Sequence, residues 1–439
     1  MLAFAYTVAM NDPRARPPVA IATSLDDASC AARPTARVLL GVTGGIAAYK
    51  CAELTRLLVK SGREVTVVMT RAATEFVGAA TFQALSGRPV YTDLWDTRPA
   101  NGMAHIELSR NADVMLVAPA SADFIARLVH GRSDDLLTTT VLARSIPLIV
   151  CPAMNLQMWQ NPATGRNVQQ LIADGVEIFG PGAGEQACGE VGDGRMLEPE
   201  QIIEALDAWA QPKLLAGRRV VVTAGPTQEA IDPVRVLTNH SSGKMGFALA
   251  RAAAEAGGNV TLVTGRVVLP TPAGVDRIDV IDAAGMLAAA VAKAEAADVF
   301  IAVAAVADYR PVNPQAQKVK KSAQPLTLTL EPTEDILATV AAHATLRGGV
   351  PYCVGFAAES EQVEKYAAEK RVRKGIPLIV ANHAESAFGA EDNAVTLIDA
   401  DGAVVLPRMA KLALARRLVA EIARRMSRRR VDSHHGSAE

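Results

Sequence analysis

The stretch VLLGVTGGIAAYKCAELTRLLVKSG, residues 38–62, decides the fold of the first half of the chain. Its near-continuous apolar start is typical of a strand buried on both faces of a parallel sheet, and its second part reads as a helix. The apolar pattern returns downstream as VTVVM, VMLVA and PLIVC, at residues 65–69, 114–118 and 147–151. Strands that alternate with helices in this way predict an α/β, doubly wound domain.

A second series of strands begins after a polar connector that contains a proline, WAQPKLLAGR at residues 209–218. RVVVTAGPT follows it directly, and further strands are expected at residues 259–265, 299–306, 352–358, 377–382 and 394–399. The connector therefore predicts a boundary between two doubly wound domains, 37–210 and 211–425. We expect the first to be flavodoxin-like or Rossmann-like and the second to be Rossmann-like.

The two ends of the chain lack these patterns. Residues 1–36 mix Pro, Arg, Ala and Asp without a helical or strand period, and the last residues, RRRVDSHHGSAE, are charged and nearly free of apolar side chains. Segments of this composition cannot bury a core. We therefore predict a disordered extension at residues 1–36 and a disordered tail at residues 426–439.

The composition excludes several classes of partner. Among 439 residues, 45 Lys and Arg stand against 46 Asp and Glu, so the net charge of −1 provides no general attraction to nucleic acid or to an anionic membrane. No apolar run approaches the roughly 20 residues that a membrane helix needs. The cysteines, at positions 30, 51, 151, 188 and 353, form no CxxC pair, which predicts neither a zinc site nor a disulfide framework and favours the cytoplasm.

A glycine turn ends the first predicted strand. Thr43, Gly44 and Gly45 lead directly into a helix, where small residues let a phosphate approach backbone N–H groups at the positive end of the helix dipole. An ordinary tight turn of an α/β fold explains the same residues equally well. The GxGxxG pattern is absent, which argues against ordinary NAD binding.

Three more patterns lie at or just after strand ends, where ligands bind in open α/β sheets. They are GMAHIEL at residues 102–108, APASAD at 118–123 and PAMNLQMW at 152–159. Taken singly, His105 is compatible with a structural histidine and Asn155 with a turn residue. A fourth pattern, GPGAGEQACGEVGDGRM at residues 180–196, predicts a glycine-rich flap that carries Cys188 to a reaction, although a surface loop with an incidental thiol has the same composition.

Taken together and in this order, the patterns from about residue 37 to residue 200 closely resemble the flavin-dependent phosphopantothenoylcysteine decarboxylases. The resemblance implies that FMN is held by Gly44, Gly45, Thr70 and Ser121. It also implies that His105 is the active-site base, that Asn155 binds the substrate carboxylate and that Cys188 donates a proton. Many members of that family have Asn where this chain has Asp123, a residue also found in the bifunctional branch.

The second half contains a polar stretch before a predicted helix, DPVRVLTNHSSGKMG at residues 232–246, which predicts an anion cradle. Thr238 and Met245 break the Walker A pattern, so a triphosphate would bind in another way. Asp308 ends the strand in VAAVADYRP. The clustered lysines of KVKK, residues 318–321, would neutralise phosphate charge, although an isolated charge run is more often a solvated surface.

Two further lysines, Lys370 and Lys374, have the i, i+4 spacing that places them on one face of a helix. Tyr366 and Lys370 also form YxxxK, the pair of short-chain dehydrogenases. The glycine-rich turn of those enzymes is missing after Val222, where the chain reads TAGPTQE, so the dehydrogenase interpretation is disfavoured.

Residues 218 to about 410 resemble the phosphopantothenate:cysteine ligase domain that bacteria fuse to such decarboxylases. The resemblance rests on TAGPT, DPVR, NHSSGKMG, AAVADYR, KVKK, VGFAAE and KRVRK, which recur in family order. It implies that CTP is bound by Asp308, Lys318, Phe356, Lys370 and Lys374. Asn239 and Arg235 would hold an acyl-cytidylate intermediate, and Asp308 would be the carboxylate nearest to Mg²⁺. The family's NPDI is replaced here by TEDI, residues 333–336.

The two resemblances imply one bifunctional enzyme of coenzyme A biosynthesis. Its second domain would couple 4'-phosphopantothenate to cysteine with CTP, and its first domain would decarboxylate the product, 4'-phospho-N-pantothenoylcysteine. Family members form homo-oligomers, up to a dodecamer. Two alternatives remain open: a flavin-binding regulatory protein without catalysis, and a flavin decarboxylase that acts on another C-terminal cysteine. Retention of both His105 and Cys188 argues against the first, and the attached ligase-like domain argues against the second.

Overall fold

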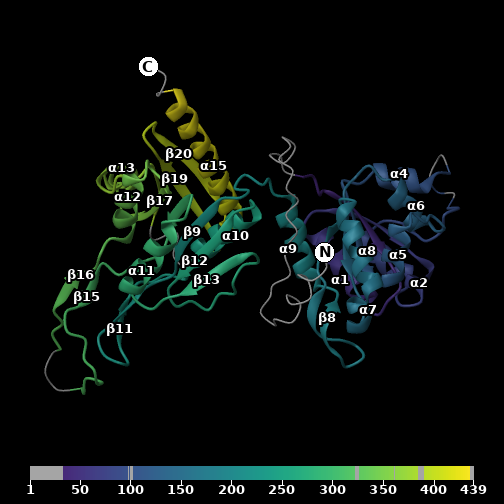
Figure 1. Cartoon of the computed structure of the whole chain (residues 1–439), viewed down its shortest axis with the longest axis horizontal. Helices are drawn as coiled ribbons and strands as arrows, with labels where there is room; N and C mark the ends of the chain where they lie inside the picture. Colours follow the sequence, from purple (N-terminus) through teal and green to yellow (C-terminus); the bar gives the residue numbers. More distant parts are fainter. Residues whose placement is uncertain are drawn as a thin grey trace, which may run out of the picture.

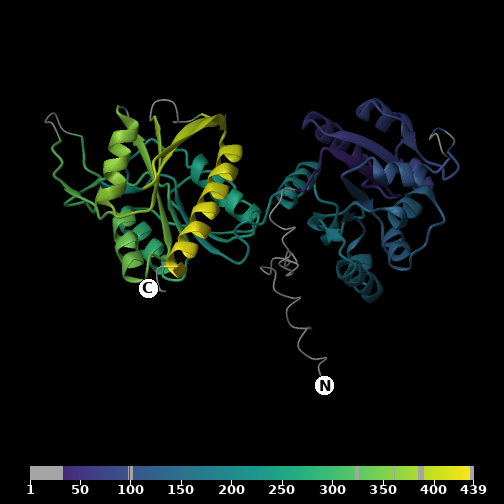
Figure 2. The ribbon, with the colours of Figure 1, turned by 90° about the horizontal axis from the view of Figure 1, so that it is seen from above.

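The computed structural model describes residues 33–96, 98, 102–321, 326–359, 361–383 and 390–435. The ribbon forms two lobes, joined where α9 leads into β9 (Figures 1 and 2). The boundary predicted within residues 209–218 falls between the end of α9 at Ala210 and the start of β9 at Arg219. Lys213 bridges the lobes, because its Nζ donates hydrogen bonds to the carbonyls of Ala208 and Glu255, both at 2.7 Å.

The first lobe is built on a six-stranded parallel sheet with the strand order β3-β2-β1-β4-β5-β6. Its strands are β1 (Arg37–Val42), β2 (Glu64–Met69), β3 (Val90–Tyr91), β4 (Val114–Ala120), β5 (Leu148–Pro152) and β6 (Glu177–Ile178). Every residue of β4 is buried, as expected for a strand covered on both faces. This order is the Rossmann arrangement, which confirms the predicted doubly wound class.

Helices cover both faces of this sheet. They are α1 (Ala48–Lys60), α2 (Arg71–Thr74), α3 (Ala79–Ser86), α4 (Ala104–Arg110), α5 (Ala122–Val129), α6 (Leu136–Ala143), α7 (Leu156–Gln160), α8 (Pro162–Ala173) and α9 (Pro199–Ala210). One core cluster joins the sheet to α1, α3 and α9, and the other joins it to α4, α5, α6 and α8. A separate hairpin, β7 (Gly182–Glu185) with β8 (Val191–Arg195), lies between β6 and α9 in the sequence.

The second lobe repeats the arrangement and extends it. Its sheet has the order β13-β12-β9-β14-β17-β18-β19-β20 and is parallel up to β18. The strands are β9 (Arg219–Ala224), β12 (Asn259–Thr264), β13 (Val275–Asp279), β14 (Val299–Ala302), β17 (Tyr352–Glu359), β18 (Leu378–His383), β19 (Asp392–Ile398) and β20 (Ala403–Ala410). β19 and β20 are antiparallel additions. β20 lies outside the predicted strands.

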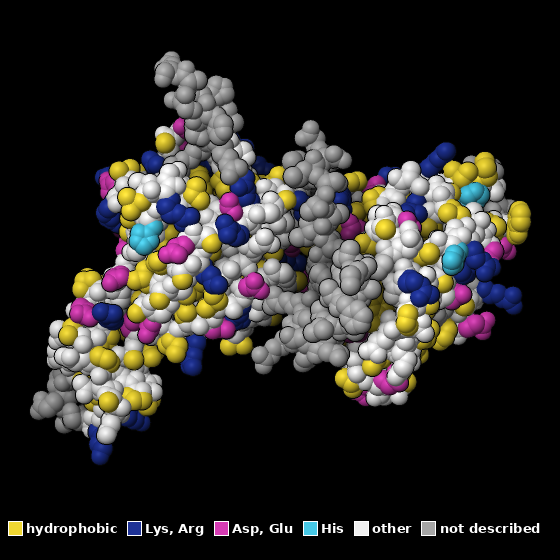
Figure 3. Space-filling view, in the orientation of Figure 1, with side chains coloured by type: hydrophobic (Ala, Val, Ile, Leu, Met, Phe, Trp, Pro, Cys, Tyr) yellow, Lys and Arg dark blue, Asp and Glu magenta, His cyan; other side chains and the backbone are white. Residues whose placement is uncertain are grey.

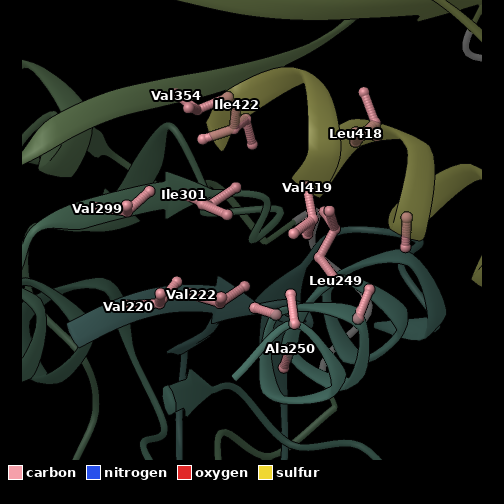
Figure 4. Close-up of a cluster of buried hydrophobic side chains, with 14 of the residues drawn as sticks. Val220, Val222, Leu249, Ala250, Val299, Ile301, Val354, Leu418, Val419 and Ile422 are labelled. Atoms are coloured by element: carbon pink, nitrogen blue, oxygen red, sulfur yellow. The ribbon is translucent and has the colours of Figure 1, made fainter. Parts of the chain in front are cut away.

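Helices also cover both faces of the second sheet. They are α10 (Lys244–Glu255), α11 (Ala283–Ala294), α12 (Ile336–Leu346), α13 (Val363–Arg373) and α15 (Lys411–His435). Figure 4 shows side chains of β9, β14 and β17 packed against Leu249 and Ala250 of α10 and Leu418, Val419 and Ile422 of α15. The opposite face packs on α11, α12 and α13.

Two short hairpins project from the second lobe as an arm (Figure 1). They are β10 (Gln228–Ala230) with β11 (Val236–Thr238), and β15 (Tyr309–Pro311) with β16 (Leu330–Pro332). Hydrophobic side chains lie on the surface of this arm (Figure 3), and exposed examples are Val234, Val236, Tyr309 and Leu330.

The ends of the chain differ in part from the prediction. Residues 1–32 of the predicted extension lie outside the described residues, but Arg33 donates its backbone N–H to Ala210 at 2.9 Å and stacks over Trp209. The predicted tail begins at residue 426, whereas α15 continues to His435. Arginine favours helices, and no glycine interrupts the segment before Gly436, so the helix has no signal to end earlier.

Candidate active sites

The point where the strand order reverses lies between β1 and β4 in the first sheet. Ligands of doubly wound proteins bind outside the carboxyl ends of the strands at this point. Thr43 joins the two strand ends there: its buried hydroxyl donates to the carbonyl of Pro119 at 2.7 Å and accepts from the backbone N–H of Ser121 at 3.1 Å. Thr43 is predicted from the sequence to lie in the turn, but it is not among the predicted site residues. A threonine directly after a buried strand was the available signal.

Three of the predicted site residues are helix N-caps at this edge of the sheet. The hydroxyls of Thr70 and Ser121 accept from the backbone N–H of the third residue along, each at 3.2 Å, and Asn155 Oδ1 accepts from Met158 at 3.1 Å. The helices they cap, α2, α5 and α7, follow β2, β4 and β5. The caps explain why Thr, Ser and Asn stand at these positions, and they bring all three residues to one edge.

Helix α1 has no side-chain cap, and the N–H groups of Ala48 and Lys50 donate to the carbonyls of Gly45 and Ala47, at 2.9 and 3.0 Å. Gly44 and Gly45 precede it for different reasons. A Cβ on Gly44 would lie 2.5 Å from the Cβ of Ala72, so this glycine is required by the approach of α2. A Cβ on Gly45 would have no atom within 4 Å, so open space remains beside the helix start. The positive end of a helix dipole next to open space fits a phosphate group.

His105 lies in the first turn of α4, which starts at the same edge because it connects the carboxyl end of β3 to β4. The imidazole is half-buried, and no hydrogen bond to it is found among the residues that the structure describes. Residues 97 and 99–101, which precede this helix, lie outside them. The position is therefore compatible with the predicted base.

Cys188 is exposed in the turn between β7 and β8. The glycine-rich flap is thus an ordered antiparallel hairpin, and it is seated on the loop that contains Asn155. The Met154 N–H donates to Gly194 O at 2.9 Å. A Cβ on Gly194 would lie 2.5 Å from the carbonyl oxygen of Met154, so only glycine permits this contact. The hairpin brings the thiol-bearing turn and the Asn155 loop together.

The second sheet reverses its order between β9 and β14, and threonines again join the strand ends. The hydroxyl of Thr223 accepts from the N–H groups of Val303 and Ala304, and the hydroxyl of Thr227 accepts from Ala307 at 2.9 Å. Asn239 donates its side-chain amide to the carbonyls of Ala305 and Val306, at 3.2 and 3.0 Å. Hydrogen bonds with Thr223, Thr227 and Asn239 therefore fix the backbone between the end of β14 and Asp308.

Helix α10 begins directly after NHSSG. Gly243 is its N-cap with a φ of 74°, a conformation that favours glycine. A Cβ on Gly246 would lie 2.5 Å from the Cβ of Ala224, so the helix start packs closely on the end of β9. Two glycines of this motif are thus explained by backbone geometry. The N-terminus of α10 points toward the same edge as Asp308.

Arg235 is engaged within the protein. Its guanidinium donates to the carboxylate of Asp232 and to the carbonyl of Val319, at 2.5 and 2.6 Å for Nη2. Asp232 also accepts from the N–H of Val319 at 3.1 Å. The side chain of Asp232 is inaccessible to solvent. The Arg235 guanidinium and backbone N–H groups hold the pKa of the Asp232 carboxyl well below its ordinary value.

Asp232 therefore organises the lysine segment 318–321. It fixes Val319, which lies between Lys318 and Lys320, while both lysines are exposed to solvent. Asp232 is not among the residues predicted from the sequence, although an aspartate three residues before an arginine in a polar stretch was a usable signal. The segment is tethered through its backbone, which leaves the ammonium groups available.

The TEDI segment connects two of the predicted nucleotide-binding residues. Thr333 donates its N–H to Asp308 O at 2.9 Å and its hydroxyl to Ala307 O. Asp335 caps α12 and pairs with Lys374 at 2.7 Å. Burial raises the pKa of Asp335, but the Lys374 ammonium and the Ala338 N–H outweigh burial and lower it. Thr333 and Asp335 thus tie the Asp308 loop to α13.

Phe356 and Lys370 complete the predicted set. Phe356 is half-buried in β17, one residue beyond Gly355, which pairs with the last residue of β14. Lys370 lies on α13, and the N–H of Lys374 donates to its carbonyl at 3.0 Å. α13 leads back to the start of β18, and Lys374 just after it is linked to the start of α12 by its ion pair with Asp335. No group of three or more His, Cys, Asp or Glu suited to a metal ion occurs among the residues that the structure describes.

Exposed apolar side chains surround the first of these sites. Ile46 and Tyr49 at the start of α1 are 62% and 61% exposed, and Phe76 after α2 is 50% exposed. None of the helices in the described part of the chain combines the length and the apolar character that crossing a membrane requires. A cluster of exposed apolar residues beside a ligand site is typical of an interface.

Two family models match the chain. One is described as Flavoprotein and matches residues 29–211, and the other is described as DNA/pantothenate metabolism flavoprotein C-terminal domain and matches residues 215–426. The coenzyme A biosynthesis bifunctional protein CoaBC of Vibrio cholerae serotype O1 is 54% identical over 384 residues, which cover 86% of this chain and 96% of that protein. CoaBC of Escherichia coli K12 is 46% identical over 396 residues, which cover 89% and 97%.

Two solved structures are similar to parts of the chain. The C-terminal domain of a CoaBC protein is 38% identical and covers 49% of this chain and 98% of its own, with a TM-score of 0.42. A PPC decarboxylase mutant complexed with pantothenoylaminoethenethiol is 33% identical and covers 39% of this chain and 97% of its own, with a TM-score of 0.37.

Proposed function

The chain belongs to the family of coenzyme A biosynthesis bifunctional proteins CoaBC, and from that premise we propose how each half performs its step. The enzyme carries a flavoprotein decarboxylase domain and a phosphopantothenate:cysteine ligase domain. We assign the decarboxylase to residues 37–210 and the ligase to residues 211–425. One observation supports these roles. The predicted residues of each half lie at the carboxyl edge of its own sheet or on a segment that is hydrogen-bonded or ion-paired to that edge.

The decarboxylase site fits FMN. Small side chains, the N-terminus of α1 and the open space beside Gly45 suit its phosphate, while Thr70 and Ser121 cap neighbouring helices. The chemistry that FMN supplies when bound is removal of two electrons from the substrate thiol and their return after CO2 has left. After oxidation of the thiol, the negative charge that is left on the carbon that loses CO2 can be delocalised onto sulfur.

The side chains of the protein then bind the substrate and transfer protons. The Asn155 amide orients the substrate carboxylate, and His105 accepts the thiol proton as the substrate is oxidised. Cys188 Sγ–H gives its proton to the carbon that has lost CO2. Without that proton the reaction stops at the enethiol, so Cys188 determines whether the saturated product, 4'-phosphopantetheine, forms.

The ligase site activates a carboxylate. The carboxylate of 4'-phosphopantothenate attacks the α-phosphorus of CTP and releases pyrophosphate, which leaves an acyl-cytidylate; the cysteine amine then attacks the acyl carbon and releases CMP. Lys318, Lys370 and Lys374 neutralise phosphate charge. Phe356 and Asp308 contact the nucleotide, and Asn239 holds the acyl intermediate, with Arg235 fixing the loop around it.

Mg²⁺ belongs to this proposal. Magnesium commonly binds through one or two carboxylates and the substrate phosphates. Asp308 provides one exposed carboxylate. This is compatible with an arrangement in which the triphosphate supplies most of the magnesium ligands.

We also propose a homo-oligomer, up to a dodecamer, in the cytoplasm. The apolar patch around Ile46 and Tyr49 would join decarboxylase domains, and the arm with Val234 and Tyr309 would join ligase domains. A reducing compartment suits the exposed thiol of Cys188. Mass measurement under native conditions checks the assembly, and a monomer would contradict it.

The test of the function uses the full chain with 4'-phosphopantothenate, cysteine, Mg²⁺ and either CTP or ATP, with mass detection of every product. We expect CMP, pyrophosphate and 4'-phospho-N-pantothenoylcysteine with CTP, followed by CO2 and 4'-phosphopantetheine. Equal turnover with ATP would overturn the CTP assignment. Lack of bound flavin in the purified protein would overturn the FMN assignment.

A further inference from the structure

Gln186 is a buried glutamine in an otherwise exposed turn. Its side chain is 9% exposed, whereas the next three residues, Ala187, Cys188 and Gly189, are all exposed. Its backbone closes the turn: the Gln186 N–H donates to Glu190 O at 2.7 Å, and the Gly189 N–H donates to Gln186 O at 2.9 Å. A polar side chain that is buried at the tip of a hairpin must satisfy its amide within the protein.

The side-chain amide of Gln186 joins two separate segments. Its Oε1 accepts from the backbone N–H of Leu156 at 2.9 Å, and its Nε2 donates to the carbonyl of Asp193 at 3.0 Å. Leu156 is the first residue of α7 and directly follows Asn155. Asp193 lies on β8, across the hairpin. One side chain therefore connects the two strands of the hairpin to the helix start that carries Asn155.

The contact with Leu156 uses a donor that the helix cannot satisfy itself. The first N–H groups of a helix have no partner within it, and the side chain of Asn155 caps only Met158. Gln186 supplies the partner for Leu156 from another part of the chain. The start of α7 therefore has two caps, one from the Asn155 side chain and one from Gln186 of the hairpin. The second cap fixes the position of the hairpin relative to the start of α7.

Gln186 also lies beside the thiol. Cys188 Sγ is 3.9 Å from Gln186 Oε1, within the range of a weak S–H···O hydrogen bond in which the thiol donates. The contact places the thiol directly beside the amide that anchors the hairpin to the start of α7.

We propose that Gln186 is a positioning residue of the decarboxylase site, which holds the Cys188 turn at a fixed place over the Asn155 end of α7. The inference depends on the roles proposed above for Asn155 and Cys188, and it adds the residue through which they are coupled. Loss of the Gln186 amide would leave both groups in the protein but would free the turn, so proton delivery would suffer more than loss of CO2.

The test compares Gln186→Leu, which keeps the size of the side chain and removes all its hydrogen bonds, with Gln170→Leu. Gln170 lies exposed on α8 and is a matched control. The flavin-loaded full-length variants are given 4'-phospho-N-pantothenoylcysteine, and the ratio of enethiol to 4'-phosphopantetheine is measured by mass. A second readout is the rate at which iodoacetamide alkylates Cys188 in the absence of substrate.

We expect Gln186→Leu to raise the enethiol ratio by about tenfold or more and to change the alkylation rate of Cys188, because small misplacements of reacting groups have large effects on rate. Ligase turnover and the Gln170→Leu variant should match the wild type. A residue needed only for stability would lower both products together and leave their ratio unchanged. That outcome, or wild-type alkylation, would overturn the proposal.

A second variant keeps the test decisive if Gln186→Leu does not fold. Gln186→Glu retains an acceptor for Leu156 but cannot donate to Asp193, so we expect an intermediate ratio. A wild-type ratio in this variant would contradict the bridge to Asp193. If the wild-type enzyme itself produced neither compound, the proposed function would fail, while the alkylation rates would still decide whether Gln186 positions the turn.

Discussion

The two lobes use one strand arrangement for different chemistry. In both, the strand order reverses between the first and fourth strands of the parallel set, and a threonine hydroxyl joins the two strand ends, Thr43 in one and Thr223 in the other. The edges differ in the side chains around that point. The first carries uncharged N-caps such as Thr70, Ser121 and Asn155, whereas the second carries ion pairs and lysines.

This difference teaches how a common scaffold acquires specificity. In the proposed decarboxylase, the neutral caps keep the local charge low and the hairpin carries the thiol of Cys188. The second edge instead fixes a loop through Asp232, and its exposed lysines are proposed to bind phosphate. The fold provides the place of binding, and the residues at the strand ends decide what binds.

The variant expected to distinguish the activities of the two lobes most strongly is Cys188→Ser. We expect formation of 4'-phosphopantetheine to fall by about 10²- to 10⁴-fold, since a positioned proton donor contributes that much, and the enethiol to accumulate. Consumption of CTP should stay at the wild-type rate. Mass detection of both products checks this, and full-speed reduction to 4'-phosphopantetheine would show that Cys188 is not the donor.

A pair of core variants tests whether the two cores are independent. Phe300 is fully buried in the second lobe and Phe82 in the first. Each Phe→Ala change should cost about 3–5 kcal/mol, because it removes apolar contacts and leaves a cavity. Calorimetry should show that Phe300→Ala shifts one transition and Phe82→Ala the other. A shift of both transitions by either variant would mean that the lobes unfold as one unit.

Asp232→Asn tests the tether of the lysine loop. The amide cannot replace the charged acceptor of Arg235 and of the Val319 N–H, so Lys318 and Lys320 should lose their fixed position. We expect ligase turnover to fall by about tenfold, mainly as a higher KM for CTP, while decarboxylation is unchanged. Glu295→Gln, an exposed carboxylate at the end of α11 in the same lobe, is the control. Unchanged KM would contradict a positioning role.

The same carboxylate predicts a pH dependence confined to acid. Because the pKa of Asp232 is held below its ordinary value of about 3.9, the stability it contributes is complete above pH 4 and is lost as the pH falls further. The difference in urea midpoint between wild type and Asp232→Asn should therefore be constant from pH 7 to about pH 4 and narrow below it. If the difference in urea midpoint already narrowed near neutral pH, a titratable group other than Asp232 would be responsible.

The smallest effect is expected between the lobes. Glu204 on α9 pairs with Arg251 on α10 at 3.1 Å, but its side chain is largely exposed. Exposed ion pairs contribute little, so Glu204→Gln should change the unfolding free energy by less than about 0.5 kcal/mol. Thermal unfolding in low and high salt checks this. A large loss of stability would indicate that this pair holds the two lobes together.

The motifs and buried strands of both sheets could be read from the chain because they depend on local patterns. VLLGV, VTVVM and VMLVA correspond to β1, β2 and β4 with differences of one or two residues at their ends. β14 is shorter than expected: it ends at Ala302, where Thr223 begins to hold the backbone. β20, with its exposed first residues, and the arm hairpins were not predicted, because exposed or very short strands lack a continuous apolar run.

The sequence by itself determined the doubly wound class and the motifs that carry Cys188, Asn155 and Asn239, since each depends on residues close together in the chain. Only the tertiary structure decided which distant groups act together. Thr43 meets Pro119, Gln186 meets Leu156, and Asp232 meets Val319, over separations that no local pattern records. The physical reason is that a hydrogen bond between distant segments exists only after the strands have aligned and brought their ends to one edge.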